Sequence, residues 1–285
     1  MKAYWIILRP VNLLLTLLTQ GLFYLSASRV YTNNLIIDWE NIRYPAALYN
    51  SLACILIASG GYIINDIFDI ETDTINKPHK RIIAKSIKLK HARIYYAILT
   101  TIGIGFGFLT GLGMGILCLT MSVLLYFYSS DFKGENLQGN LLISLMAGMV
   151  VYVASRGVYG VSKTFFAEYA CIAFLITLSR EMIKDIEDME GDAIQGYNTY
   201  PLLKGIKKTK ILSFISFFLA LLLLPIIYFQ SYEILFLAFS AVILLPFAAF
   251  IAIKMYKAKN TEDYSNISKY LKQIMFAGLI SCLVC

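Results

Sequence analysis

The sequence has little charge for its length, and this shortage is its most informative feature. Only 15% of the 285 residues are charged, whereas 58% are hydrophobic, and the mean hydropathy is +0.67. A soluble domain is closer to roughly half apolar and about a quarter charged, so the composition argues against a soluble protein. Apolar runs long enough to cross a bilayer recur along the chain. The sequence therefore predicts an integral membrane protein with several spans.

The sequence also lacks the ligand clusters and polar modules that several classes of protein require. The five cysteines lie within or at the end of apolar runs, and both histidines, His79 and His91, lie far from the terminal Cys282 and Cys285. We therefore interpret the cysteines as small hydrophobic residues and not as metal ligands. A basic soluble module is absent, so nucleic acid is not an expected partner. Since no long polar linker divides the chain, residues 1–285 are expected to form one domain.

Apolar runs bounded by charged or turn residues predict nine transmembrane helices. The expected fold is an all-α bundle of these helices around a central cavity. The third and fourth runs are separated only by the glycine-rich stretch TGLGMG, which makes their boundary the least distinct. The predicted spans are 6–27, 46–65, 94–111, 114–129, 141–160, 165–183, 211–229, 233–253 and 268–285.

The distribution of basic residues predicts how these helices are oriented. If the N-terminus is cytoplasmic, all but four of the 25 Lys and Arg residues lie on the cytoplasmic side, the exceptions being Arg29, Arg43, Arg156 and Lys163. Cytoplasmic loops of membrane proteins are enriched in Lys and Arg, so we expect a cytoplasmic N-terminus. The net charge of +7 also suits contact between these loops and anionic membrane lipids.

Ten of the 18 acidic residues fall in two clusters, at the ends of the second and sixth predicted helices. The clustered aspartates are Asp66, Asp69 and Asp73, then Asp185, Asp188 and Asp192. Both sets follow the spacing i, i+3, i+7, which places each within an arc of about 60° on one helical face. Stacked carboxylates raise one another's pKa unless cations lie among them. Solvated helix ends are the ordinary explanation for one cluster, but two matched clusters at the membrane edge favour Mg²⁺ bridged by a polyphosphate.

Basic residues near both clusters supply the cations that a diphosphate needs in addition to its metals. Lys77, Lys80 and Arg81 follow the first cluster, and Lys184 lies beside the second. Any single lysine is more often an orientation charge than a ligand contact. Lys133 is the exception in our interpretation, because it is the only positive charge in its loop.

Several motifs together resemble those of the UbiA superfamily of intramembrane prenyltransferases. NDIFDIETD matches the family pattern NDxxDxxxD, and KDIEDMEGD matches its second motif in the form KDxxDxxGD. LRPVN in the first helix, NKP after the first motif, YSSDFKGENLQGN and TYPL occur in the family's order. The resemblance spans residues 8 to about 205, and nine helices agree with the family fold. The chain departs from the family at NKPHKR, where Lys80 occupies the usual arginine position and Arg81 follows it, so which of them contacts diphosphate is left open.

The resemblance implies Mg²⁺-dependent transfer of a prenyl group from an isoprenyl diphosphate to a lipophilic acceptor. It implies an active site near the cytoplasmic face of a bacterial or archaeal cell membrane. Carried over by position, the implied catalytic residues are Asp66, Asp69, Asp185 and Asp188, with Glu181 as a candidate base for an acceptor hydroxyl. The implied metal ligands are these four aspartates with Asp73 and Asp192. The implied substrate contacts are Asn12, Asn65, Lys77, Lys80, Arg81, Tyr128, Lys133, Asn140 and Lys184.

The acceptor is predicted less sharply than the reaction. The stretch REMIKDIEDMEGD, followed by TYPL, is most similar to the family branch that alkylates geranylgeranylglyceryl phosphate. An aromatic quinone precursor such as hydroxybenzoate, or cyclisation of the prenyl chain, stays as an alternative. The intact NDxxDxxxD motif argues against the branches that make haem O or alkylate naphthoate.

The residues disfavour two classes outside this family. A CDP-alcohol phosphotransferase needs a DG…AR element before its paired aspartates, and the sequence has none. A cation transporter is expected to place its acids at the middle of the membrane on broken helices. Here the acids lie at helix ends beside lysines suited to phosphate, so both classes are disfavoured.

Overall fold

The computed structural model describes residues 2–30, 40, 42–70, 82–159, 163–231 and 233–285. Apolar runs form helices because backbone N–H and C=O groups in hydrocarbon must be satisfied within the segment. The long helices are α2 (Pro10–Val30), α3 (Tyr44–Phe68), α5 (Leu89–Thr110), α6 (Leu112–Phe127), α7 (Gln138–Tyr152), α8 (Lys163–Ile194), α10 (Ile206–Ser231), α12 (Leu245–Lys257) and α13 (Thr261–Ser281). The prediction of an all-α membrane bundle is confirmed.

Shorter elements extend or connect the long helices. They are α1 (Lys2–Ile6), α9 (Tyr200–Lys204), α11 (Ile234–Phe239), π-helical turns at Tyr128–Phe132 and Ser240–Leu244, and 3₁₀ turns at Val153–Gly157 and Cys282–Val284. The bundle is not purely helical, because β1 (Glu135–Asn136) and β2 (Asn198–Thr199) form a two-residue parallel pair. The α11 helix continues through the second π turn into α12, so these three pieces act as one span.

The helix count agrees closely with the nine predicted spans. Within the described residues, eight segments are long and apolar enough to cross a membrane. The remaining long helix, α8, carries too much charge to be counted with them. It was predicted to end near residue 183 but continues through the second acid cluster to Ile194. The break between α5 and α6 lies at Gly111, whose φ of 149° is in the range that favours glycine.

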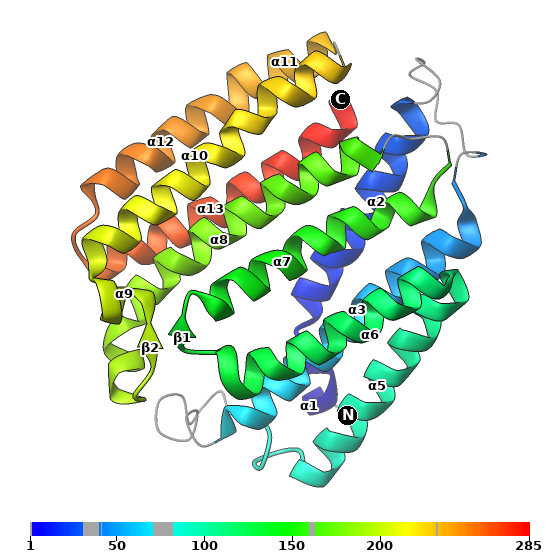
Figure 1. Cartoon of the computed structure of the whole chain (residues 1–285), viewed down its shortest axis with the longest axis vertical. Coiled ribbons are helices and arrows are strands. Elements are labelled where there is room, and N and C mark those ends of the chain that lie inside the picture. The colour runs from blue at the N-terminus through cyan, green and yellow to red at the C-terminus, as the bar shows by residue number, and fades with distance from the viewer. Residues whose placement is uncertain (1, 31–39, 41, 71–81, 160–162, 232) are drawn as a thin grey trace.

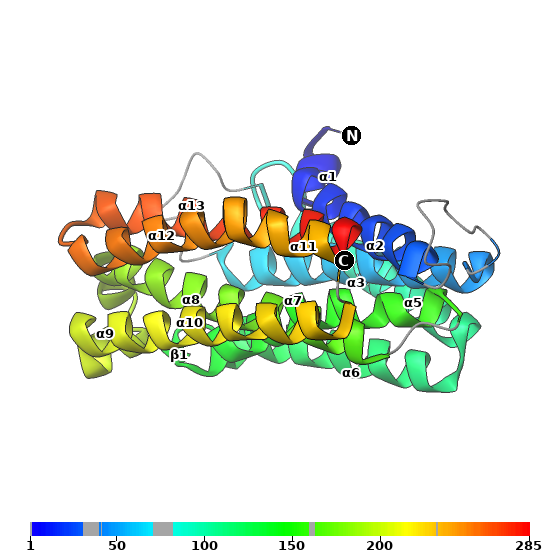
Figure 2. The same ribbon diagram turned by 90° about the horizontal axis from the view of Figure 1, so that it is seen from above.

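The helices lie alongside one another in a flattened bundle (Figures 1 and 2). Figure 1 shows α3, α5 and α6 on one side, α10, α12 and α13 on the other, and α7 and α8 between them. The largest buried cluster includes residues of α2, α8, α10, α12 and α13. A separate cluster joins α1, α3 and α5. The acid-bearing end of α3, with Ile63, therefore lies in a different cluster from α8, although Ala47 at the other end of α3 packs in the same cluster as α8.

Candidate active site

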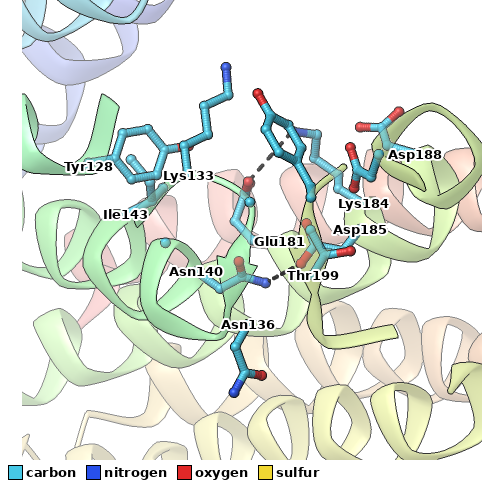
Figure 3. Close-up of a pocket in the computed structure, with 14 residues that line it drawn as sticks. Tyr128, Lys133, Asn136, Asn140, Ile143, Glu181, Lys184, Asp185, Asp188 and Thr199 are labelled. Atoms are coloured by element: carbon cyan, nitrogen blue, oxygen red, sulfur yellow. Dashed lines mark hydrogen bonds and ion pairs between the residues drawn. The ribbon is translucent and has the colours of Figure 1, made fainter. Parts of the chain in front are cut away.

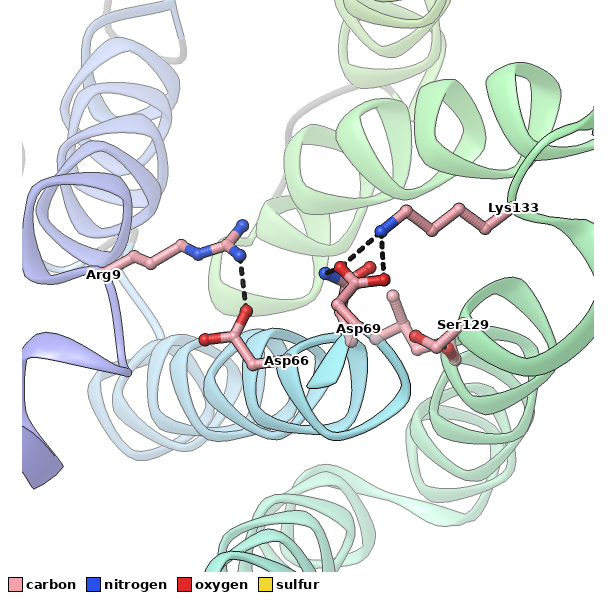
Figure 4. Close-up of polar contacts among 7 residues, drawn as sticks. Arg9, Asp66, Asp69, Ser129 and Lys133 are labelled. Atoms are coloured by element: carbon pink, nitrogen blue, oxygen red, sulfur yellow. Dashed lines mark hydrogen bonds and ion pairs between the residues drawn. The ribbon is translucent and has the colours of Figure 1, made fainter. Parts of the chain in front are cut away.

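The first acid cluster lies where α3 ends. Asp66 is in the last turn of the helix. Asp69 is the first residue after the helix, and its backbone N–H donates to the Asn65 carbonyl over 2.9 Å. The side-chain amide of Asn65 donates to Asp69 Oδ2 over 2.7 Å. Lys133 ion-pairs with both carboxylate oxygens of Asp69, at 2.6 Å to Oδ1 (Figure 4). The predicted group of Asn65, Asp66, Asp69 and Lys133 is thus brought together in the structure.

Arg9 completes this cluster and was missed as a site residue from sequence. It lies in the break between α1 and α2, with a φ of 54°, directly before Pro10 starts α2. Its guanidinium donates to Asp66 Oδ1 over 2.8 Å and lies 4.8 Å from the centre of the Tyr62 ring. In the sequence, Arg9 is only one of the basic residues assigned to the cytoplasmic side. Its position in the LRPVN motif, at the start of a helix, was the available signal.

The second acid cluster lies on one face of α8, as its spacing predicted. Asp185, Asp188 and Asp192 all line a pocket between α8 and the segment that joins α6 to α7 (Figure 3). Asn140, in the first turn of α7, donates its side-chain amide to Asp185 Oδ2 over 2.7 Å. The predicted contact residue Asn140 therefore orients an acid of the second motif.

Other predicted residues line the same pocket. They are Tyr128, Lys133, Glu181 and Lys184. The structure adds six lining residues that were not expected from the sequence, namely Gly134, Asn136, Gly139, Ile143, Tyr197 and Thr199. Thr199 belongs to the TYPL motif, which was a signal for it. The others come from the strand pair, from the segments beside it and from α7, and strands of two residues are too short to be recognised in a sequence.

The β1–β2 pair joins the two loops that form one side of the pocket. Glu135 is opposite Asn198 and Asn136 is opposite Thr199, and the Asn198 N–H donates to the Gly134 carbonyl over 2.7 Å. Gly134 has a φ of 84°, and a Cβ there would lie 2.5 Å from the Tyr197 ring. Only glycine suits this position, because both the backbone conformation and the close approach exclude a side chain.

Lys133 and Tyr128 link the two acid clusters. Lys133 pairs with Asp69 of the first cluster and interacts electrostatically with Asp192 of the second. Tyr128 is close enough to Asp69, Asp185 and Glu181 to interact with all three carboxylates. The acids of α3 and α8 therefore face a common region, although they come from different parts of the core.

The electrostatics of α8 favour cations at this pocket. Asp185 and Asp192 lie beyond residue 183, where the predicted span ends. Burial raises the pKa of Asp185 to about 7, and Glu181 and Asp192 add to the rise while Asn140 and Lys184 oppose it. Burial, followed by the Asp188 carboxylate, raises the pKa of Asp192 to about 6. Both acids therefore hold their negative charge at a cost, which a bound cation would remove.

The described residues contain no complete set of metal ligands. Among them, no three His, Cys, Asp or Glu side chains converge closely enough to hold a metal ion by themselves. The donors are carboxylate oxygens, which suit Mg²⁺, and this ion usually takes only one or two protein carboxylates together with phosphate oxygens and water. The donor set therefore fits Mg²⁺ bound jointly with a phosphorylated substrate.

Some predicted site residues are not placed by the structure on the pocket wall. Asp73, Lys77, Lys80 and Arg81 lie outside the described residues. Asn12 lies on α2 and shares a hydrogen bond with Tyr62, one turn before Asp66 on α3. It therefore belongs with Arg9 beside the first cluster.

Comparison with known proteins finds relatives along nearly the whole chain. Residues 10–277 match the model of the UbiA prenyltransferase family. The chain is 32% identical over 285 residues to the digeranylgeranylglyceryl phosphate synthase of Methanosphaera stadtmanae, covering 99% of this chain and 98% of that protein. It is 28% identical over 251 residues to the enzyme of the same name from Saccharolobus solfataricus, covering 85% and 86% of the two chains.

Solved structures share the fold over nearly the whole chain. A structure described as that of digeranylgeranylglyceryl phosphate synthase superposes with a TM-score of 0.81 at 28% identity, covering 99% of this chain and 97% of that one. A UbiA homologue from Archaeoglobus fulgidus, bound to GPP and Mg²⁺, superposes with a TM-score of 0.71 at 16% identity, covering 98% and 99%. The family match, the two acid motifs and the helical bundle agree, and the chain belongs to the UbiA prenyltransferase family of integral membrane enzymes.

Proposed function

We propose that this enzyme transfers a prenyl group from an isoprenyl diphosphate to geranylgeranylglyceryl phosphate, within an archaeal or bacterial membrane. The observation that carries this proposal is the convergence of the two acid clusters on Lys133 and Tyr128. The choice of acceptor is supported by full-length similarity to relatives named digeranylgeranylglyceryl phosphate synthase. The distribution of basic residues supports an active site near the cytoplasmic face.

The residues divide into groups according to what they would hold. Asp66, Asp69, Asp185, Asp188 and Asp192 would hold Mg²⁺, together with oxygens of the diphosphate. Asp73, Lys77, Lys80 and Arg81, outside the described residues, are proposed to complete the ligands and cations. When bound, Mg²⁺ supplies positive charge that stabilises the departing diphosphate.

The chain's own cations and dipoles supply the remaining stabilisation. Lys133 and Lys184 are placed to donate to diphosphate oxygens, and charge-assisted hydrogen bonds of this kind strengthen as the leaving group gains charge. Asn65 and Asn140 hold the carboxylates of Asp69 and Asp185 in place. Tyr128 closes the wall between the two clusters.

The proposed reaction exchanges one C–O bond for another. The bond between C1 of the prenyl chain and the diphosphate oxygen breaks, and the diphosphate leaves with the electron pair. The free hydroxyl oxygen of the acceptor then bonds to C1, and its proton passes to Glu181. Exclusion of water from the site prevents hydrolysis of the electron-poor prenyl carbon. Both substrates have apolar tails, so each is expected to enter from the lipid bilayer.

A direct assay tests both the reaction and the acceptor. Purified protein in lipid nanodiscs is given labelled geranylgeranyl diphosphate with either geranylgeranylglyceryl phosphate or hydroxybenzoate. We expect an ether-linked product with the lipid acceptor, and no product when Mg²⁺ is chelated. Prenylated hydroxybenzoate as the main product would assign the aromatic alternative instead.

Two acid variants test the residues that would bind Mg²⁺. We expect Asp69→Ala and Asp188→Ala to abolish turnover without lowering the thermal stability of the metal-free protein. Glu190→Ala is the matched control, because Glu190 is an exposed acid of the same helix that is not on the pocket wall. Retained activity in both aspartate variants would contradict the proposed metal site.

A further inference from the structure

Glu181 is held between two cations on the wall of the pocket. One of its carboxylate oxygens, Oε1, ion-pairs with Nη1 of Arg180, and the other, Oε2, lies 3.5 Å from Nζ of Lys184. Figure 3 shows Glu181 and Lys184 facing the pocket, joined by this ion pair. Arg180 and Lys184 are four residues apart, so they lie on the same side of α8. The carboxylate therefore fixes two positive groups one helical turn apart.

Binding of the diphosphate does not account for the presence of Arg180. It lies inside the predicted span 165–183, where a charged side chain is costly and is usually functional. Its side chain is only 26% exposed, and its Nε is buried without a hydrogen-bond partner in the described part of the chain. A guanidinium carries five N–H donors, and the ion pair with Glu181 engages one Nη atom. Arg180 therefore keeps donors for an anion that approaches from the membrane side of Glu181.

The reaction brings two separate anions to this site. In the proposed function the diphosphate lies between the two acid clusters, beside Lys133, and Lys184 is next to Asp185 on the same helix. The lipid acceptor brings a phosphate of its own, on the glycerol carbon next to the one that carries the free hydroxyl. If Glu181 takes the hydroxyl proton, the acceptor phosphate must lie beside Glu181 and away from the diphosphate. Arg180 is the cation that contacts Glu181 on that side.

We propose that Arg180 binds the phosphate of the acceptor lipid, while Glu181 separates it from Lys184 and the diphosphate. This inference rests on the proposed function, since it requires a phosphorylated acceptor. A planar guanidinium binds phosphate through two parallel hydrogen bonds, which a lysine cannot reproduce. Arg180 thus selects a phosphorylated lipid over an uncharged one.

The proposal also gives Glu181 a change of partners during binding. In the structure both of its carboxylate oxygens are paired with cations. An acceptor phosphate that engages Arg180 competes with Glu181 for the guanidinium. One carboxylate oxygen of Glu181 is then released from Arg180 and can face the acceptor hydroxyl.

Binding measurements test this inference without turnover. Protein in nanodiscs, with Mg²⁺ chelated, is titrated with geranylgeranylglyceryl phosphate, with its dephosphorylated form geranylgeranylglycerol, and with glycerol 1-phosphate. Arg180→Gln is expected to weaken binding of the phosphorylated lipid at least tenfold and to leave binding of the uncharged lipid within threefold. Glycerol 1-phosphate is expected to bind weakly and to depend on Arg180 as well.

Steady-state kinetics with Mg²⁺ distinguish the residue that binds the acceptor phosphate from the residue that binds the diphosphate. Arg180→Gln is expected to raise KM for the acceptor at least tenfold and KM for the prenyl diphosphate less than threefold, whereas Lys184→Gln is expected to do the reverse. Arg180→Lys, which keeps the charge and the fold, should recover only part of the loss. Lys208→Gln, at an exposed lysine of α10, is the control for loss of one positive charge.

The possible outcomes also separate this inference from the proposed function. Wild-type protein that makes no product with the lipid acceptor overturns the proposed function. Wild-type protein that makes the product, with an Arg180→Gln variant that binds the phosphorylated lipid normally, overturns this inference alone. Equal weakening of both lipids, or of acceptor and diphosphate together, also overturns it, because a phosphate-specific contact would not act in that way.

Discussion

Substitution of Gly134 by alanine is expected to open the β1–β2 pair while leaving the helical bundle intact. Gly134 adopts a φ of 84°, and an added Cβ would lie 2.5 Å from the Tyr197 ring. The left-handed conformation costs a residue with a Cβ about 1–2 kcal/mol. Overpacking against the ring adds about 1–3 kcal/mol.

This strain is larger than what the strand pair contributes. Each hydrogen bond of the pair stabilises the folded state by about 1 kcal/mol net, and the pair is only two residues long. The loop is therefore expected to relieve the strain by separating from β2. Lys133, directly before Gly134, would then lose its fixed position against Asp69, and misplacing one charge-assisted contact corresponds to about a tenfold rise in KM for the prenyl diphosphate.

Hydrogen exchange and kinetics measure the two parts of this prediction. Exchange at residues 134–137 and 197–199 should accelerate at least tenfold in Gly134→Ala, with the helices unchanged. Gly196→Ala tests the cost of the left-handed backbone conformation without the clash against a ring. Gly196 has a φ of 74°, but nothing lies near its absent Cβ. Gly113→Ala, in α6 with open space and no unusual φ, is the neutral control. Normal exchange and normal KM in Gly134→Ala would refute the reasoning.

Three further predictions concern the charges of the site. Lys133→Met should lower kcat/KM by a factor of about 10²–10³, as loss of one donor to a departing oxyanion does. Lys133→Arg should recover part of this loss. An unchanged kcat/KM in Lys133→Met would show that Lys133 does not contact the diphosphate. Since the pKa of Asp185 is raised to about 7 and that of Asp192 to about 6, apparent Mg²⁺ affinity measured by calorimetry with a diphosphate present should fall as pH decreases from 8 to 5.5. The same shifts make the metal-free protein more stable to unfolding at pH 5.5 than at pH 8, because the folded state binds more protons; added Mg²⁺ should reduce that difference, and a stability that rises with pH would contradict it.

The acid clusters show what a sequence can predict about such a site. The spacing of Asp185, Asp188 and Asp192 defines a helical face, and the structure has that face on α8. Hydropathy predicts the end of α8 too early, at residue 183, because it detects only the apolar part of a helix and not the charged turns that continue it. The charged turns beyond residue 183 remain helical, since α8 packs against α7, α10 and α13 and stays continuous to Ile194.

The contacts between distant segments could not be predicted in the same way. The ion pair of Arg9 with Asp66 joins residues 57 positions apart, and its formation depends on how α2 lies against α3. The β1–β2 pair has two residues in each strand, too few for any alternating pattern to be recognised. The pairing of Arg180 with Glu181 joins neighbours in sequence, but which way an arginine turns within a membrane helix is decided by packing.

The strand pair also affects how freely the sequence of this side of the pocket can change. β1 and β2 associate through main-chain atoms, and the side chains of Glu135 and Asn198 point into solvent. Replacing these side chains therefore does not remove the bonds that join the two loops. The residues at these two positions can therefore change in evolution while Asn136 and Thr199, which line the pocket, and the helices that carry the acids stay where they are.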